Sequence, residues 1–305
     1  MDVDVLKNLL TVVFAVSSML AMGLTLTVKQ IWAPLRRNPR RVALAIFASW
    51  VIVPAVAWLL AQFVAQSNRE YAAGLILFAS VAGAPFIIKL TEVAEGDIAL
   101  ATGLVVLLLV GTVIYLPLAL PLLLPIGVPA GQVATQLSLQ LLLPLGIGLF
   151  ASARYPEGAA TIVDITHKTS NVSLVLLLVL IVVTSIGDMI GMFGTGAVAA
   201  TIAVVAVAVI SGALFGGPSR AGRTTLALAL GQRNMAAAFV VANASLAPYP
   251  DVFAYLAGAS MLVLVVMFVF AGEIRRRGLS HQRGEEVVQE PAPAAPFSPE
   301  RPAPA

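Results

Sequence analysis

Long apolar runs constrain this chain more than any other feature. Residues 97–125 and 194–216 consist almost entirely of aliphatic and small residues, and each run provides the about 17–25 residues that a helix needs to cross a bilayer. Hydrophobic residues make up 59% of the 305 residues, and charged residues only 11%. The alternating segments of about ten residues that are typical of an outer-membrane barrel are absent. Because helices are the other structure that satisfies its backbone in lipid, the sequence predicts an all-α polytopic membrane protein.

Nine transmembrane spans are predicted. They lie at about 7–28, 41–64, 71–93, 97–125, 131–152, 162–187, 194–216, 223–246 and 251–273. Basic residues concentrate after the first, fifth, seventh and ninth spans, which places them on one side of the membrane. The positive-inside rule then puts the N-terminus outside and the C-terminus in the cytoplasm. Only four of the 18 basic residues are lysine, a bias compatible with a GC-rich bacterial genome, so we expect a bacterial inner membrane.

Two of the predicted spans are interrupted. The third contains "SVAGAPFIIKL", in which Gly83 and Pro85 lower helix propensity and the proline removes a backbone donor. The eighth contains "ALGQRNMAAAF", in which Gly231 precedes three polar residues. The two spans occupy corresponding places in two halves of the chain, which is typical of an inverted-repeat transporter whose discontinuous helices cross at the binding site. The simpler alternative is that glycine and proline merely kink these helices.

The eighth span carries a charge near its middle. Arg233 lies roughly ten residues into the span, which at about 1.5 Å per residue is close to the bilayer midplane. An isolated arginine costs at least about 2.5–3.5 kcal/mol there, so Arg233 is expected to face a cavity, a carboxylate or a ligand. The predicted substrate-binding residues are Arg233, its neighbours Gly231, Gln232 and Asn234, and Pro85 of the other break.

Three further ionisable residues lie close to the breaks. Lys89 is a second candidate for binding an anion, but a helical ion pair with Glu92, three residues further on, explains it equally well. Asp97 begins the fourth span, where a carboxylate complements the helix dipole. Asp97 and Glu92 are therefore candidates for an ion pair or a proton-linked role as well as for a structural one.

No enzyme or metal constellation emerges from the sequence. There is no cysteine, and the two histidines, His167 and His281, have no second ligand at metal spacing. The sequence thus predicts neither a metal nor a cofactor. The net charge of +3 comes from basic residues in short connections, so nucleic acid is not a predicted partner. The predicted partners are a small organic anion and the lipid bilayer, and the oligomeric state stays open.

Four short motifs together resemble the bile acid:sodium symporter family. They are "MGLTL" at 22–26, a span with Pro54 and Trp58 after a basic loop, "EGDIAL" at 95–100 and "GQRN" at 231–234. The resemblance runs over about residues 10–273, in the family's order and spacing. It implies a transporter with a core domain that contains two crossed, discontinuous helices, and a panel domain that rocks against the core.

The resemblance also implies domain boundaries. Residues 1–274 would form the transmembrane transporter domain, with the core at about 41–64, 71–125, 194–216 and 223–273 and the panel at about 7–28 and 131–187. The chain looks like the family's nine-span form. Residues 275–305 are rich in proline and charge and poor in large apolar residues, so they are predicted to be a disordered cytoplasmic tail.

The chain departs from the family at the positions of the sodium ligands. Instead of the oxygen-bearing side chains of sodium-coupled members it has Ile87, Ile88, Ala101, Val105, Ala229 and Arg233, with Ser49 in place of a glutamine. Sodium needs oxygen ligands, which alkyl side chains do not provide. We therefore expect a transporter of a small organic anion, not coupled to sodium, in which Arg233 stands where the family holds the cation. The alternatives are a sodium-coupled symporter of bile-acid-like or ketoacid anions, and a membrane sensor or scaffold that does not transport.

Overall fold

The protein is all-helical throughout residues 3–124 and 127–288, which the computed structural model describes. The α-helices are α1 (Val3–Thr25), α2 (Val28–Arg37), α3 (Pro39–Phe47), α4 (Val53–Val64), α5 (Arg69–Ser80), α6 (Phe86–Val93), α7 (Ile98–Leu123), α8 (Ala130–Leu137), α9 (Leu143–Arg154), α10 (Pro156–Gly191), α11 (Ala197–Phe215), α12 (Arg220–Gly231), α13 (Met235–Ser245) and α14 (Pro250–Val288). Two π-helical turns, η1 (Ala48–Ile52) and η2 (Ser138–Leu142), join α3 to α4 and α8 to α9, and the 3-10 turn η3 (Met192–Thr195) follows α10.

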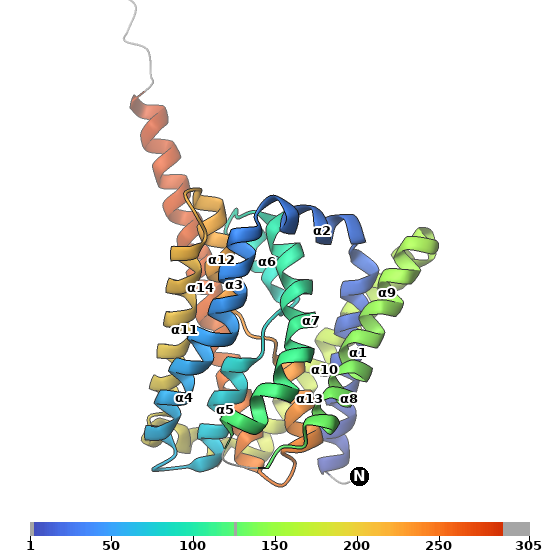
Figure 1. The fold of residues 1–305 in the computed structure, drawn as a ribbon, viewed down its shortest axis with the longest axis vertical. Helices are drawn as coiled ribbons and strands as arrows, with labels where there is room; N and C mark the ends of the chain where they lie inside the picture. Colours follow the sequence, from blue (N-terminus) through green and yellow to red (C-terminus); the bar gives the residue numbers. More distant parts are fainter. Residues whose placement is uncertain (1–2, 125–126, 289–305) are drawn as a thin grey trace, which may run out of the picture.

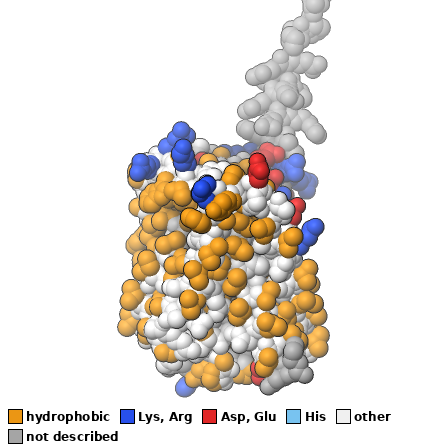
Figure 2. Space-filling model, turned by 90° about the vertical axis from the view of Figure 1, so that its right-hand side faces the viewer, with side chains coloured by type: hydrophobic (Ala, Val, Ile, Leu, Met, Phe, Trp, Pro, Cys, Tyr) orange, Lys and Arg blue, Asp and Glu red, His pale blue; other side chains and the backbone are white. Residues whose placement is uncertain are grey.

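Eight segments of the described chain are long and apolar enough to cross a membrane. They are Val3–Thr25, Pro39–Val64, Ile98–Leu123, Ala130–Arg154, Pro156–Thr195, Ala197–Phe215, Arg220–Ser245 and Pro250–Arg277. Their outward faces carry large apolar side chains, such as Leu122, Leu214 and Phe63, at 70–85% exposure. Figure 2 shows hydrophobic side chains covering one flank of the molecule, while lysines and arginines gather at the end from which α14 emerges. The molecule is a multi-pass membrane protein.

The predicted third span is not among these eight segments. Instead of one helix over 71–93, the chain forms α5 and α6 with a non-helical stretch at 81–85 between them. Each piece is too short to cross a bilayer of about 30 Å by itself. The cause is local: Gly83 adopts a left-handed φ of 79°, and Pro85 lies at the N-cap of α6.

Two stretches that the sequence predicts to be irregular are helical. The basic connection after the first span contains α2, which crosses the end of the bundle in Figure 1 and begins with a capping box between Thr27 and Gln30. At the C-terminus, α14 continues to Val288, so the first part of segment 275–305 is a helix, and residues 289–305 lie outside the described part. No proline occurs between residues 275 and 288, so the backbone donors that a helix needs are present.

The helices differ in burial and pack chiefly in two groups. In the Arg220–Ser245 segment, which contains α12 and α13, 94% of the most apolar stretch of 18 residues is buried, whereas in Pro156–Thr195 the buried share is 11%. The broken α12–α13 pair is therefore central and α10 peripheral. Helix α1 packs chiefly against α9 and α10, whereas α11 packs against α12 and α4, and α4 against α5. In Figure 1, α5 and α13 lie toward one end of the bundle and α6 and α12 toward the other, so the two broken pairs run in opposite directions.

Candidate functional site

The first break, residues 81–85, is held from the side by α7. The backbone N–H of Ala82 donates to the Thr112 hydroxyl oxygen at 3.0 Å, and the same hydroxyl donates to the Ala82 carbonyl at 3.2 Å. Gly83 presses against this helix so closely that a Cβ there would lie 2.2 Å from the Leu109 nitrogen and 2.6 Å from the Val105 oxygen. These contacts satisfy backbone groups that a helix would have paired and that lipid cannot satisfy.

The Thr112 contact predicts a measurable loss of stability. Thr112→Val keeps the shape of the side chain but leaves the buried Ala82 N–H without an acceptor, at a cost of about 1–3 kcal/mol. The apparent melting temperature of the purified protein should fall by roughly 2–8 °C. Thr102→Val is the matched control on the same helix, because the Thr102 hydroxyl only donates to the Ile98 carbonyl one turn earlier, at 2.9 Å. Equal shifts for the two variants would contradict the role given to Thr112.

The second break, Gln232–Asn234, touches the first. Helix α12 ends at Gly231, and α13 begins after Asn234, whose side-chain oxygen accepts from the Ala237 N–H at 3.1 Å. The amide nitrogen of Asn234 donates to the Gly83 carbonyl at 3.0 Å. One side chain thus caps a helix and ties the two breaks together.

Arg233 is buried at this contact, with 1% of its surface exposed. Its Nη1 donates to the Val81 carbonyl at 3.4 Å, whereas Nε and Nη2 have no hydrogen-bond partner among the described residues. The ion pairs among the described residues do not include Arg233, so no carboxylate of these residues neutralises it. A guanidinium with unused donors in a dry interior is costly unless a ligand or a rearrangement satisfies it.

The environment of Arg233 includes residues that sequence patterns do not single out. Tyr115 is close enough to interact electrostatically with Arg233 and to bond the Ser80 side chain, and it stacks on Trp50 with ring centroids 5.8 Å apart. Trp50 belongs to the π-helical turn η1, which lies just before Pro54. Because proline cannot donate to the helix ladder, the turn before it widens, and such turns are frequent at functional sites. Pro54 is the one sequence signal that pointed to this turn.

The other predicted site residues lie apart from Arg233 or play local roles. Lys89 forms an ion pair with Glu92 at 2.8 Å, and both side chains are more than half exposed. Asp97 caps α7, because its carboxylate accepts from the Leu100 N–H at 2.9 Å. Its own backbone N–H donates to Thr225 Oγ1 at 2.7 Å.

The remaining predicted residues border the two breaks. Pro85 is the N-cap of α6, Gly231 is the last residue of α12, and Gln232 is buried with its side-chain oxygen unpaired among the described residues. No group of three or more histidine, aspartate or glutamate residues that could hold a metal ion occurs in the described chain.

Two broken helix pairs that meet deep inside a bundle of long apolar helices define a membrane protein built around a central polar crossing. The model of the Sodium Bile acid symporter family matches residues 12–192, more than half of the chain, and the protein belongs to this family. It is therefore a secondary transporter of a small solute and not an enzyme. A comparison with individual curated proteins gives no match. The matched region contains the first break and ends before the second, so the family match does not extend to Arg233.

Proposed function

We propose that the protein transports a small organic anion, a carboxylate or a sulfonate, by alternating access, and that Arg233 provides the positive charge that binds it. The observation that carries the proposal is the buried Arg233 guanidinium with two unused donor nitrogens at the contact between the breaks. A guanidinium presents donors in a planar fork that matches a carboxylate or sulfonate bidentately. Only 1% of the Arg233 surface is exposed, which fits a conformation in which the site is closed to both sides.

The same contact argues against sodium coupling. In the absence of side-chain ligands, sodium would have to bind backbone carbonyl oxygens of the first break. Three of these carbonyl oxygens already accept hydrogen bonds from protein side chains. Val81 O accepts from Arg233, Ala82 O from Thr112 and Gly83 O from Asn234. A guanidinium beside these oxygens also repels a second cation. Coupling would then be to protons, to exchange against a second anion, or absent.

Replacement of sodium by potassium tests this directly. In proteoliposomes, uptake of a labelled anion chosen from a thermal-shift screen of carboxylates and sulfonates should change by less than about twofold when potassium replaces sodium, because no site requires the smaller ion. Empty liposomes provide the leak control. Strict sodium dependence would contradict the proposal and favour the sodium-coupled alternative, which the name of the family supports.

We further propose that the chain crosses the membrane nine times as an inverted repeat. Eight crossings are the long apolar segments given above, one of which is the broken α12–α13 pair, and α5 with α6 would supply the ninth. An odd number fits the positions of the two ends, since the N-terminus and the exit of α14 lie at opposite ends of the bundle in Figure 1. The opposite directions of the broken pairs support the repeat. The separate packing of α1, α9 and α10 supports a panel distinct from the core.

The basic end of the molecule would face the cytoplasm of a bacterial inner membrane. The N-terminus would then lie outside. A non-transporting sensor or scaffold is the second alternative. An ion pair between Arg233 and a carboxylate would favour this alternative, and no carboxylate of the described residues forms one.

A further inference from the structure

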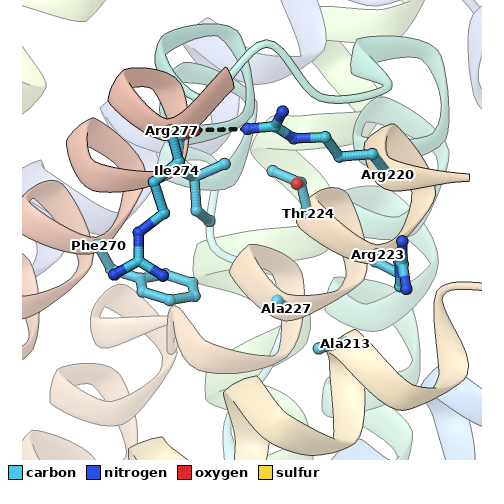
Figure 3. A pocket seen from close by; sticks show the side chains of 8 residues that line it. All are labelled: Ala213, Arg220, Arg223, Thr224, Ala227, Phe270, Ile274 and Arg277. Carbon is cyan, nitrogen blue, oxygen red and sulfur yellow. Dashed lines mark hydrogen bonds between the residues drawn. The ribbon is translucent and has the colours of Figure 1, made fainter. Parts of the chain in front are cut away.

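A second charged site lies at the surface, away from the crossing. A pocket with a volume of about 640 Å³ opens between α11, α12 and α14 at the basic end of the molecule. Three arginines surround it: Arg220 and Arg223 from the first turn of α12, and Arg277 from α14 (Figure 3). All three side chains are exposed. This is the densest group of cations at any pocket described for the chain.

The arginines leave the pocket with an excess of positive charge. Arg220 Nη2 donates to the Ile274 carbonyl at 2.8 Å, which fixes its side chain across the gap between α12 and α14. Arg277 Nε bonds Glu273 Oε1 at 2.8 Å. Glu273 therefore offsets one of the three charges, and Arg220 and Arg223 bring two further guanidinium charges to the lining of the pocket.

The position of these two arginines on α12 adds to the excess. The N-terminus of a helix carries about half a positive charge, so cations in its first turn are unfavourable. Helix α12 nevertheless begins with Arg220 and has Arg223 in its first turn, and no acidic residue lies there. An anion in the pocket would satisfy both side chains and the helix end at once. The two arginines at the start of α12 are thus electrostatically unfavourable in the absence of an anion, and they lie where the pocket opens.

Apart from Thr224, the rest of the pocket lining is apolar, and it lies beside helix positions that are exposed on the flank. Its floor includes Ala213, Ala227 and Phe270. The residues next to this floor in sequence, Leu214 on α11 and Val269 on α14, are 73% and 66% exposed on the flank of the bundle. A free anion would engage the arginines and leave the apolar floor in water. A phospholipid would cover both, with its headgroup at the arginines and an acyl chain along the floor.

We propose that this pocket binds an anionic phospholipid, with the headgroup phosphate between Arg220, Arg223 and Arg277 and one acyl chain against Phe270. Basic pockets between transmembrane helices at the cytoplasmic side bind anionic headgroups by this combination of charge and apolar area. The lipid would join α11, α12 and α14 at the end of α12 opposite the second break. The proposal does not depend on which solute the protein transports.

The test uses the full-length protein, delipidated in a neutral detergent. Native mass spectrometry and thermal shift would follow titration with phosphatidylglycerol, phosphatidylcholine or inorganic phosphate. We expect phosphatidylglycerol alone to stay bound and to raise the apparent melting temperature. In the double variant Arg220→Gln/Arg223→Gln the apparent affinity should fall at least about tenfold, because two charge-assisted hydrogen bonds to the phosphate are lost.

Arg36→Gln/Arg37→Gln is the matched control. It removes the same charge from exposed arginines at the end of α2, on the same side of the molecule, and should leave lipid binding unchanged. A second variant, Ala213→Trp, fills the floor and keeps every arginine, so it should also lose the lipid and remains informative if the charge variant does not fold. The proposal would be overturned if the control variant lost lipid binding to the same extent, or if phosphatidylcholine stayed bound as well as phosphatidylglycerol. It would also be overturned if inorganic phosphate alone raised the melting temperature equally, or if Ala213→Trp bound the lipid like the wild type.

Discussion

Arg233→Ala is expected to lower uptake of the organic anion in proteoliposomes by at least about 25-fold. Truncating one partner of a buried, charge-assisted pair costs about 2–5 kcal/mol, and each 1.4 kcal/mol is about a factor of ten. Lys89, the other cation predicted at the breaks, offers no substitute, since it is paired with Glu92 and exposed. Arg233→Lys keeps the charge but loses the planar fork, so an intermediate loss is expected.

Folding of the Arg233 variants should be unaffected or improved, which separates this prediction from simple destabilisation. In the resting protein the guanidinium is buried, has two nitrogens without a partner among the described residues, and makes one long hydrogen bond. Replacing such a group by an apolar one of similar size removes a desolvation cost. Arg233→Met should therefore melt at the same or a higher temperature than the wild type and transport nothing. Retained uptake in Arg233→Met would exclude Arg233 from substrate binding. A large fall in melting temperature would show that the charge serves the fold.

The breaks were predictable because their causes are local. Gly83 and Pro85 cannot continue a helix comfortably, and Gly231 followed by polar residues ends α12 where the sequence indicates. The short length of α5 and α6 follows from the same residues. Sequence patterns also marked Arg233 as buried, because its depth in the span follows from counting residues.

The contacts between the breaks were not predictable, because they join residues far apart in the chain. The Arg233 bond to Val81 and the Asn234 bond to Gly83 span 152 and 151 positions. Single-sequence patterns carry no information on such pairs. The contact of Thr112 with Ala82 was not predictable for the same reason. A threonine in an apolar helix usually donates to a backbone carbonyl of its own helix, as Thr102 does. Lys89 illustrates the opposite case, in which the local explanation, an ion pair with Glu92, is the one found in the structure.

Gly83→Ala is expected to destabilise the protein strongly. Two costs add at this position. The left-handed φ of 79° penalises any Cβ by about 1–2 kcal/mol. The Cβ would also lie 2.2 Å from the Leu109 nitrogen, a backbone atom of α7 that cannot move aside like a side chain. Overpacking of this kind typically costs a further 1–3 kcal/mol or more. We expect an apparent melting temperature at least about 10 °C below that of the wild type, or no folded protein after solubilisation.

Gly196→Ala separates the two costs. Gly196 has nearly the same φ, 76°, but a Cβ there would meet no atom within 4 Å. This variant should lose only the conformational part, a shift of roughly 2–6 °C, and keep full uptake. Equal shifts for the two glycines would mean that α7 yields readily at Leu109. Gly83 also accepts the Asn234 hydrogen bond, so a mobile α7 would place the flexibility needed for alternating access at the crossing itself. A larger shift for Gly83→Ala than for Gly196→Ala, which we expect, indicates instead that the surrounding helices move around a fixed crossing.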